Sequence, residues 1–401
     1  MTFSLSKVIN GTLLVAGTAT GAGMLALPVA TAAGGFWPAF FMYLLCWAFM
    51  SGTGLLLLEV CIWMPHDANM VTMAGHIFGR RGKAVSWVLY LFLFYSLTVA
   101  YVAGGGGFFT AVANNSLSNW QGIALFVLVF GTIVYLGTKA IHRINYLLMA
   151  GLIGTYLLFV ILGWDRVDTK LLKPMDLFQG VLALPVIFTA FSYQGIVPSL
   201  SAYMSRNSRM LKLAILVGTA IPLVAYIIWE FLILGIVPLE GEFGLLATKM
   251  AGQTAVYPLK HFVESPYVYM IGQFFAFFAL TTSFLGVTLG LVDFLADGLQ
   301  VKKEGWRRVW LCLLVFLPPM VVAMNNPTIF IIALTYAGGI GCALLLGLLP
   351  TLMVWKGRYK LELLPKKRQL PGGKALLVAF VVFVIFELGI EIYQELARLT
   401  S

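Results

Sequence analysis

The backbone groups of a glycine-rich stretch, Gly17–Gly23, are the first candidates for binding chemistry in this sequence. The stretch reads Gly-Thr-Ala-Thr-Gly-Ala-Gly, and each glycine destabilises a helix by roughly 1 kcal/mol relative to alanine, so we expect a helix to break here. The half-helix after the break would expose the amides of Gly21, Ala22 and Gly23, which suit a carboxylate. The half-helix before it would leave carbonyls near Ala16, which suit an ammonium group.

A second stretch, Phe188–Gly195, repeats this arrangement between Pro185 and Pro198. Because proline removes a backbone donor and clashes with the preceding turn, two prolines and a glycine interrupt a helix here as well. Carbonyls near Thr189 and Phe191 would add to the acceptors for an ammonium group. Together the two breaks would hold the two charged ends of an α-amino acid without any charged side chain.

Side chains near the breaks predict an aromatic ligand. Rings at positions 95, 188, 191 and 284 offer edge and face contacts, and Gln194 or Ser192 offers a polar partner for a phenol or an indole. Aromatic residues make up 14% of the chain, so each ring is also a candidate for packing or lipid contact. The expected substrate-binding residues are Ala16, Gly17, Thr18, Thr20, Gly21, Ala22, Gly23, Tyr95, Phe188, Thr189, Phe191, Ser192, Gln194 and Phe284.

Acids inside apolar segments are the candidates for ion coupling, because burying a carboxylate in a membrane is costly. Asp293 and Glu59 lie in such segments, and each would serve either as a proton carrier or as half of a structural ion pair. A sodium site is the alternative to proton coupling. Carbonyls near Ala16 and the hydroxyls of Thr282 and Ser283 would form that all-oxygen site.

The composition indicates which elements position these residues. Apolar residues make up 60% and charged residues 10% of the 401 positions, whereas soluble domains hold about 25% charged residues. We therefore expect an all-α polytopic membrane protein with eleven helices long enough to cross about 30 Å of hydrocarbon. These segments cover roughly residues 6–33, 36–63, 84–113, 119–138, 144–163, 177–203, 211–237, 263–297, 308–324, 327–354 and 374–397.

The distribution of basic residues predicts the orientation. With the N-terminus in the cytoplasm and the C-terminus in the periplasm, most of the 26 Lys and Arg residues fall in cytoplasmic loops, as the positive-inside rule requires. The net charge of +10 follows from this topology and implies no nucleic-acid partner. The basic residues left outside are Arg166, Lys170, Lys173, Lys249, Lys260 and Arg398.

Motifs of the common enzyme classes are absent from the sequence. It contains no H-E-x-x-H, no G-x-S-x-G and no G-x-x-x-x-G-K-[ST]. The four cysteines lie in predicted spans without C-x-x-C spacing, so we expect neither a disulfide framework nor a metal site. We expect a protein that is not an enzyme, uses no cofactor and needs no obligate protein partner.

The spacing of the two broken helices predicts an internal repeat. The first and sixth spans are five apart, and because five is odd the second copy enters the membrane from the opposite side. The chain is thus expected to contain a first five-helix repeat (1–163), an inverted second repeat (164–354) and an extra segment with the eleventh helix (355–401). Substrate would bind at the midplane between the repeats.

Two further segments carry expectations about packing. The four glycines Gly104–Gly107 in the third span indicate close helix packing or a bend. The longest outside loop, Pro238–Phe262, would either cover an outer vestibule as a lid or serve as a simple connector.

Several motifs resemble those of the bacterial hydroxy and aromatic amino acid permeases, above all the tyrosine-specific members. The similarity extends in order over nearly the whole chain. The matching motifs are Gly-Thr-x-x-Gly-Ala-Gly-Met-Leu-Ala-Leu-Pro (17–28), Leu-Leu-Leu-Leu-Glu-Val (55–60), Pro-Val-Ile-Phe-Thr-x-Phe (185–191), Val-Pro-Ser (197–199), Ile-Pro-Leu-Val-Ala-Tyr (221–226) and Thr-Ser-Phe-Leu-Gly-Val-x-Leu-Gly-Leu-x-Asp (282–293).

This resemblance implies an eleven-span symporter of the bacterial inner membrane, with the leucine-transporter fold, that uses the proton gradient to import tyrosine or a related aromatic amino acid. Two departures limit what carries over. Some proton-coupled relatives in the wider superfamily carry a lysine in the fifth span, and residues 144–163 contain none. Gln194 stands where related tyrosine permeases can have histidine, so the choice among tyrosine, tryptophan and phenylalanine stays open.

Overall fold

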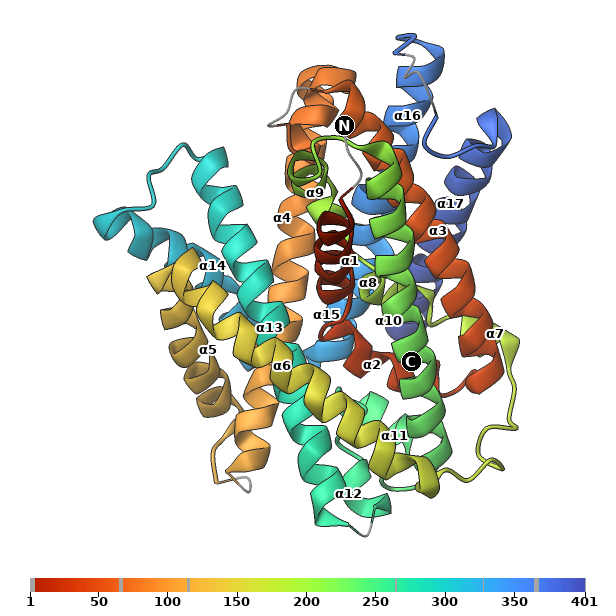
Figure 1. Cartoon of the computed structure of the whole chain (residues 1–401). Helices are drawn as coiled ribbons and strands as arrows, with labels where there is room; N and C mark the ends of the chain where they lie inside the picture. The colour runs from red at the N-terminus through yellow and green to blue at the C-terminus, as the bar shows by residue number, and fades with distance from the viewer. Residues whose placement is uncertain are drawn as a thin grey trace.

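The computed structural model describes residues 4–64, 68–113, 116–263, 265–326, 328–363 and 368–400. Helices hold 82% of the structure and no strand occurs within these ranges, which confirms the predicted all-α class. The long helices lie side by side in one bundle (Figure 1). Three short helices lie near its centre: α1 (Leu5–Ala19), α2 (Gly23–Thr31) and α8 (Leu184–Ala190).

The other elements divide into long helices and short connecting pieces. The long helices are α3 (Phe36–Trp63), α4 (Met70–Val112), α5 (Asn119–Leu136), α6 (Thr138–Gly163), α10 (Ser208–Ile236), α13 (Pro266–Gly298), α14 (Gly305–Asn325) and α17 (Gly373–Thr400). The short pieces are η1 (Trp164–Arg166), α7 (Leu177–Val181), η2 (Gln194–Ile196), α9 (Val197–Tyr203), α11 (Leu245–Met250), α12 (Leu259–Phe262), α15 (Ile329–Tyr336), the π-helical η3 (Ala337–Leu348) and α16 (Leu349–Tyr359).

The number of membrane-spanning helices is close to the expected eleven. Within the described residues, nine helices are long and apolar enough to cross a membrane, and α1 with α2 makes a tenth if the pair is one broken span. Helices α15, η3 and α16 form one of the nine. The expected sixth span, residues 177–203, consists of α7, α8, η2 and α9, so the count of eleven stays a prediction.

Both expected helix breaks occur at the positions that the sequence indicates. Helix α1 ends at Ala19, α2 begins at Gly23, and the two axes differ by 53°. Helix α8 ends at Ala190, and the chain turns through η2 before α9 begins at Val197. The inverted relation between the two halves stays a prediction.

Side-chain caps mark where several helices start. Asn69, Asp176 and Asn207 cap α4, α7 and α10. The side-chain oxygen of each accepts the amide hydrogen of the residue three positions later, at 2.8, 3.0 and 3.2 Å. These bonds satisfy backbone donors that lack a partner inside the helix.

The four-glycine segment of α4 serves helix packing. A Cβ atom on Gly105 would lie 2.5 Å from the ring of Phe126, and one on Gly106 would lie 2.4 Å from Ile123, both on α5. The helix continues through the segment. Of the two alternatives, close packing is confirmed.

The 238–262 segment folds onto α2. It contains α11 and α12, and the amide of Ala255 donates to the carbonyl of Leu25 at 2.9 Å. Ala255 and Val256 are fully buried. The segment is therefore packed against the second half of the broken helix; its role as a lid stays a prediction.

The π-helical segment η3 packs against α8 with almost no space between the backbones. A Cβ atom on Gly338 would lie 1.6 Å from the carbonyl oxygen of Pro185. One on Gly339 would lie 2.3 Å from the carboxyl of Glu391 on α17. Glycine is therefore required at position 338, where the wider turn of η3 meets the backbone of α8, whereas the Glu391 side chain opposite Gly339 can move.

Candidate functional site

The first break exposes backbone amides, as the glycine-rich sequence predicts, and one of them already has a side-chain partner. The amide of Ala22 donates to Oγ of Ser283 on α13 at 2.9 Å. A Cβ atom on Gly21 would lie 2.3 Å from the same oxygen. Gly21 thus lets α13 approach the start of α2, and Ser283 occupies one of the donors expected to hold a carboxylate.

The carbonyl ends of both half-helices converge on one tyrosine that the sequence did not single out. The hydroxyl of Tyr226 on α10 lies 2.6 Å from the carbonyl oxygen of Ala19 and 2.9 Å from that of Ala190. Ala19 ends α1 and Ala190 ends α8, so the two breaks meet here. These two carbonyls lie three residues after Ala16 and one residue after Thr189, where the sequence predicted acceptors, and both contact Tyr226; their role in binding an ammonium group stays a prediction.

Backbone contact joins the two breaks directly. A Cβ atom on Gly23 would lie 3.0 Å from Cα of Ala190. Since the neighbour is backbone and not a flexible side chain, a larger residue at position 23 would push α2 away from α8. Gly23 therefore sets the distance between the two half-helices.

A cluster of buried aromatic rings surrounds this meeting point. The ring of Phe191 lies 5.1 Å from that of Tyr226 and 6.4 Å from that of Tyr43, both in edge-to-face geometry. Tyr101 on α4 lies close to Ser283 and Tyr226. Of the four rings expected from the sequence, Phe191 is the one that contacts other rings at the meeting point of the breaks.

The other three expected rings contact different parts of the bundle. The hydroxyl of Tyr95 donates to the carbonyl of Leu314 on α14 at 2.8 Å. Phe188 packs against Phe49 on α3 and against α17, with ring centroids 5.3 and 5.7 Å away. Phe284 packs against rings on α5 and α14, at 5.0 and 5.8 Å. These contacts support packing roles.

The polar side chains expected at the breaks have partners within the protein. Gln194 is fully buried, and its Nε2 lies 3.2 Å from the carbonyl of Met50 and 3.1 Å from Oγ1 of Thr53 on α3. The hydroxyls of Thr189 and Ser192 donate to backbone carbonyls at 2.7 Å, those of Leu334 and Thr189 respectively. Gln194 thus ties the second break to α3.

The remaining residues of the first break are less enclosed. Thr18 is exposed, and its hydroxyl donates to the carbonyl of Leu14 one turn earlier in α1. Gly17 and Thr20 are half-buried, and the amide of Thr20 donates to the carbonyl of Ala16 at 2.8 Å. In the alternative sodium site, the hydroxyl of Thr282 donates within α13, to Phe278 at 2.8 Å.

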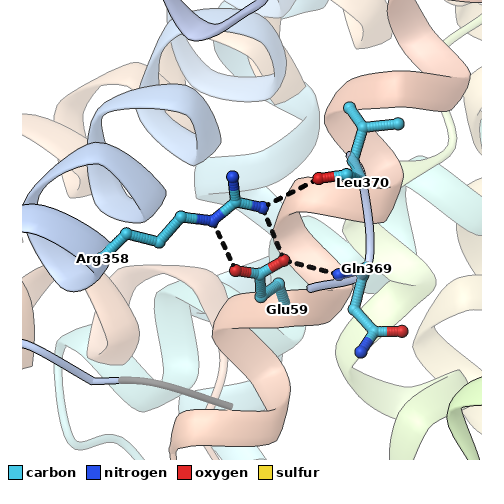
Figure 2. A network of polar contacts seen from close by, with 4 residues as sticks. All are labelled: Glu59, Arg358, Gln369 and Leu370. Carbon is cyan, nitrogen blue, oxygen red and sulfur yellow. Dashed lines mark hydrogen bonds and ion pairs between the residues drawn. The ribbon is translucent and has the colours of Figure 1, made fainter. Parts of the chain in front are cut away.

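Glu59 forms a buried ion pair with Arg358 on α16 (Figure 2). Two guanidinium nitrogens lie 2.7 Å from the two carboxylate oxygens, and both side chains are at most 1% exposed. The carboxylate also accepts the amide hydrogen of Gln369 at 2.7 Å, while Arg358 donates to the carbonyl of Leu370 at 3.1 Å. Of the two roles left open for Glu59, this geometry supports structural pairing.

Asp293 lies near the surface. Its carboxylate accepts a bond from Lys303 at 2.7 Å, and the side chains of the two residues are 48% and 49% exposed. An exposed pair of this kind contributes about 0 to 1 kcal/mol to stability. Asp293 is therefore not buried, whereas we would expect a proton carrier inside the membrane to be buried.

The structure singles out a third acid, Glu230, on α10. It is fully buried, and its carboxyl contacts the hydroxyls of Thr31 at the end of α2 and Tyr43 on α3. The signal in the sequence was the charge itself, one acid within a long apolar run. What the sequence could not indicate was its position beside the broken helix.

The fold and the site together define a class: a multi-pass membrane protein whose broken helices meet inside a helical bundle, an arrangement found in secondary transporters. Within that class, the sequence matches the tryptophan/tyrosine permease family over residues 5–390, and the chain belongs to this family. It is a transport protein and not an enzyme.

The relatives are aromatic amino acid transport proteins. The tyrosine-specific transport system 1 of Haemophilus influenzae is 33% identical over 381 residues, 94% of each chain. The tyrosine-specific transport system 2 of the same organism is 32% identical over 96% of each chain. Its tryptophan-specific transport protein is 30% identical over 98% of each chain. The family match over residues 5–390 includes both breaks.

Proposed function

We propose that this protein imports an aromatic amino acid, with tyrosine favoured, by proton symport across the bacterial inner membrane. The observation that carries the proposal is the meeting of the two breaks. Two carbonyl ends converge within 2.9 Å of the Tyr226 hydroxyl, and the amide end of α2 lies beside them. These opposite partial charges suit the ammonium and carboxylate groups of an amino acid.

The aromatic surroundings support the substrate class. Phe191, Tyr43 and Tyr226 form edge-to-face pairs at the breaks, and a substrate ring would join the same kind of contact. Relatives of both tyrosine-specific and tryptophan-specific kinds match the chain at similar identity. The ranking of tyrosine over tryptophan therefore needs a direct comparison.

The proposed architecture is that of the leucine-transporter fold, with eleven spans and two inverted five-helix repeats. The breaks in the first and sixth expected spans support it, because each half would contribute one broken helix to a shared site. The N-terminus would lie in the cytoplasm and the C-terminus in the periplasm. Labelling of single cysteines placed near residues 5 and 398 with a membrane-impermeant reagent would test this orientation.

The test of function is transport by the purified protein in liposomes. An alkaline interior without sodium on either side is expected to drive accumulation of labelled tyrosine, and an uncoupler is expected to abolish it. Accumulation that requires a sodium gradient would refute proton coupling and favour the alternative sodium site. Unlabelled tyrosine, tryptophan, phenylalanine and serine are compared as competitors, and the strongest competition by serine would refute the aromatic assignment.

A further inference from the structure

The buried acid Glu230 joins three elements around the first break. It lies on α10, its Oε1 contacts the hydroxyl of Thr31, and its Oε2 accepts the hydroxyl hydrogen of Tyr43 at 2.6 Å. Thr31 is the last residue of α2, and Tyr43 is on α3. All three side chains are fully buried. The carboxyl therefore links the second half of the broken helix to two long helices.

The number of hydrogens available at this site favours a neutral carboxyl. The hydroxyl of Thr31 has one hydrogen but contacts two acceptors, Glu230 and the carbonyl of Leu27 at 2.8 Å. A proton on Oε1 of Glu230 would be donated to Thr31, whose own hydrogen would then go to Leu27. Every contact then has its hydrogen. An ionised carboxylate would need the Thr31 hydrogen and leave the Leu27 contact without one.

The charges around Glu230 favour the same state. The ion pairs formed among the described residues are Lys303–Asp293, Arg358–Glu59 and Arg398–Glu395, so none of them includes Glu230. Burying an ionised carboxylate without a cation is strongly unfavourable. The elements that pack against α10, and α10 itself, carry these titratable or charged groups: Tyr43, Cys46, Glu59 and Cys61 of α3, Lys139, His142, Arg143, Tyr146 and Tyr156 of α6, Lys7 of α1, Asp165 and Arg166 of η1, and Arg209, Lys212 and Tyr226 of α10.

Among these groups, Tyr43 is the one whose hydrogen bond to the carboxyl the structure shows. Glu59 is engaged with Arg358, and Lys7 lies over the ring of Tyr203. Asp165 and Arg166 are exposed. The hydroxyl of Tyr156 donates to the carbonyl of Ala225 at 2.9 Å.

Glu230 is also connected to the meeting point of the two breaks. Its partner Tyr43 packs edge-to-face against Tyr226 and Phe191, with centroids 6.5 and 6.4 Å away. Tyr226 in turn contacts the carbonyl ends of α1 and α8. A change of charge at Glu230 would therefore alter its contact with Thr31 on α2, and it would reach the proposed substrate site through Tyr43.

We propose that Glu230 is the proton-binding group of the transport cycle. It is neutral in the conformation described here, where it holds α2 against α10 and α3. It releases its proton in a conformation in which water reaches the carboxyl, and the link to α2 then weakens. This inference rests on the proposed proton symport and names its acid, in place of Asp293 or Glu59.

Glu230→Gln provides the principal test, since glutamine keeps the shape and the hydrogen-bonding capacity but cannot exchange a proton. In liposomes, the variant is expected to exchange internal for external tyrosine without a gradient, as the wild type does. Accumulation driven by a pH gradient, and the accompanying proton entry reported by an internal pH dye, are expected to fall to background. Glu391→Gln, another buried acid in a span, is the matched control and keeps both.

Each outcome bears on the inference. Gradient-driven accumulation by Glu230→Gln at the wild-type level would overturn it, as would loss of accumulation in the control while Glu230→Gln retains it. Wild-type protein that exchanges tyrosine but does not accumulate it under a pH gradient would refute the proposed symport itself. The wild-type result thus distinguishes a failure of the proposed symport from a failure of the assignment of Glu230. Tyr43→Phe keeps the ring and removes one donor to the carboxylate.

Tyr43→Phe also keeps the inference testable if Glu230→Gln does not fold. Removing a donor favours the neutral acid, so the pH at which tyrosine exchange declines is expected to move upward. An unchanged pH profile in Tyr43→Phe would overturn the inference.

Discussion

The buried ion pair between Glu59 and Arg358 supports a quantitative prediction about stability. Arg358→Met removes two charge-assisted hydrogen bonds of 2.7 Å, while the Glu59 carboxylate keeps its hydrogen bond from the amide of Gln369. Breaking one side of a buried pair costs about 3 to 5 kcal/mol, because the other charge stays buried. Glu59→Met leaves the guanidinium with the carbonyl of Leu370 and is expected to cost a similar amount.

The double variant Glu59→Met/Arg358→Met distinguishes pairing from independent contributions. Replacing both partners by apolar residues of similar volume is often neutral or stabilising. We therefore expect the double variant to be more stable than either single variant, so that the two single-variant costs do not add. The half-exposed pair of Asp293 and Lys303 is the control, and Lys303→Met is expected to change stability by at most about 1 kcal/mol.

The assay is unfolding of the purified protein in mixed micelles, followed by the fluorescence of its ten tryptophans. Single-variant costs that add up in the double variant would refute the assignment of a coupled pair. A cost below about 1 kcal/mol for Arg358→Met would refute the argument from burial. Proton-driven tyrosine accumulation by the folded double variant would, in addition, exclude Glu59 as the proton carrier.

Three further predictions concern packing. Gly21→Ala is expected to displace the Ser283 hydroxyl from the Ala22 amide and to reduce tyrosine uptake several-fold. Adding Ser283→Ala removes the clash, so the double variant should transport tyrosine faster than Gly21→Ala. An equal or lower rate would contradict the contact between Gly21 and Ser283. Gly338→Ala is expected to destabilise the protein strongly, because its Cβ would lie 1.6 Å from the carbonyl oxygen of Pro185. Gly389 on α17 has open space around it, so Gly389→Ala is the control and should unfold at or above the wild-type temperature. The carboxyl oxygens of Glu387 lack a hydrogen-bond partner among the described residues. Glu387→Met should therefore stabilise the protein by about 1 to 3 kcal/mol in the same unfolding assay. Destabilisation would contradict the argument that this buried carboxyl is unsatisfied.

Much of the fold follows from patterns that the sequence displays directly. Apolar segments of sufficient length predicted most of the spans, and clustered glycines and prolines predicted both breaks. These features are local, since helix length and helix interruption depend on residues close together in the chain. The same holds for Gly105 and Gly106, whose small size indicated close packing before the partner helix was known.

The site was only partly predictable because its contacts join distant segments. Tyr226 is one of 16 tyrosines, and nothing around it in the sequence indicates that its hydroxyl meets two helix ends. Phe284 and Tyr95 are as aromatic as Phe191, yet their contacts lie with α5 and α14. Which face of a uniformly apolar helix points inward depends on tertiary packing, and periodicity does not reveal it.

The pair shown in Figure 2 also has a consequence for the order of synthesis. Glu59 precedes Arg358 by 299 residues. At 5 to 20 residues per second, about 15 to 60 s pass between the synthesis of the acid and that of its partner. During that interval α3 carries a carboxyl that has no guanidinium, and α3 therefore cannot reach its final packing until Arg358 has been made.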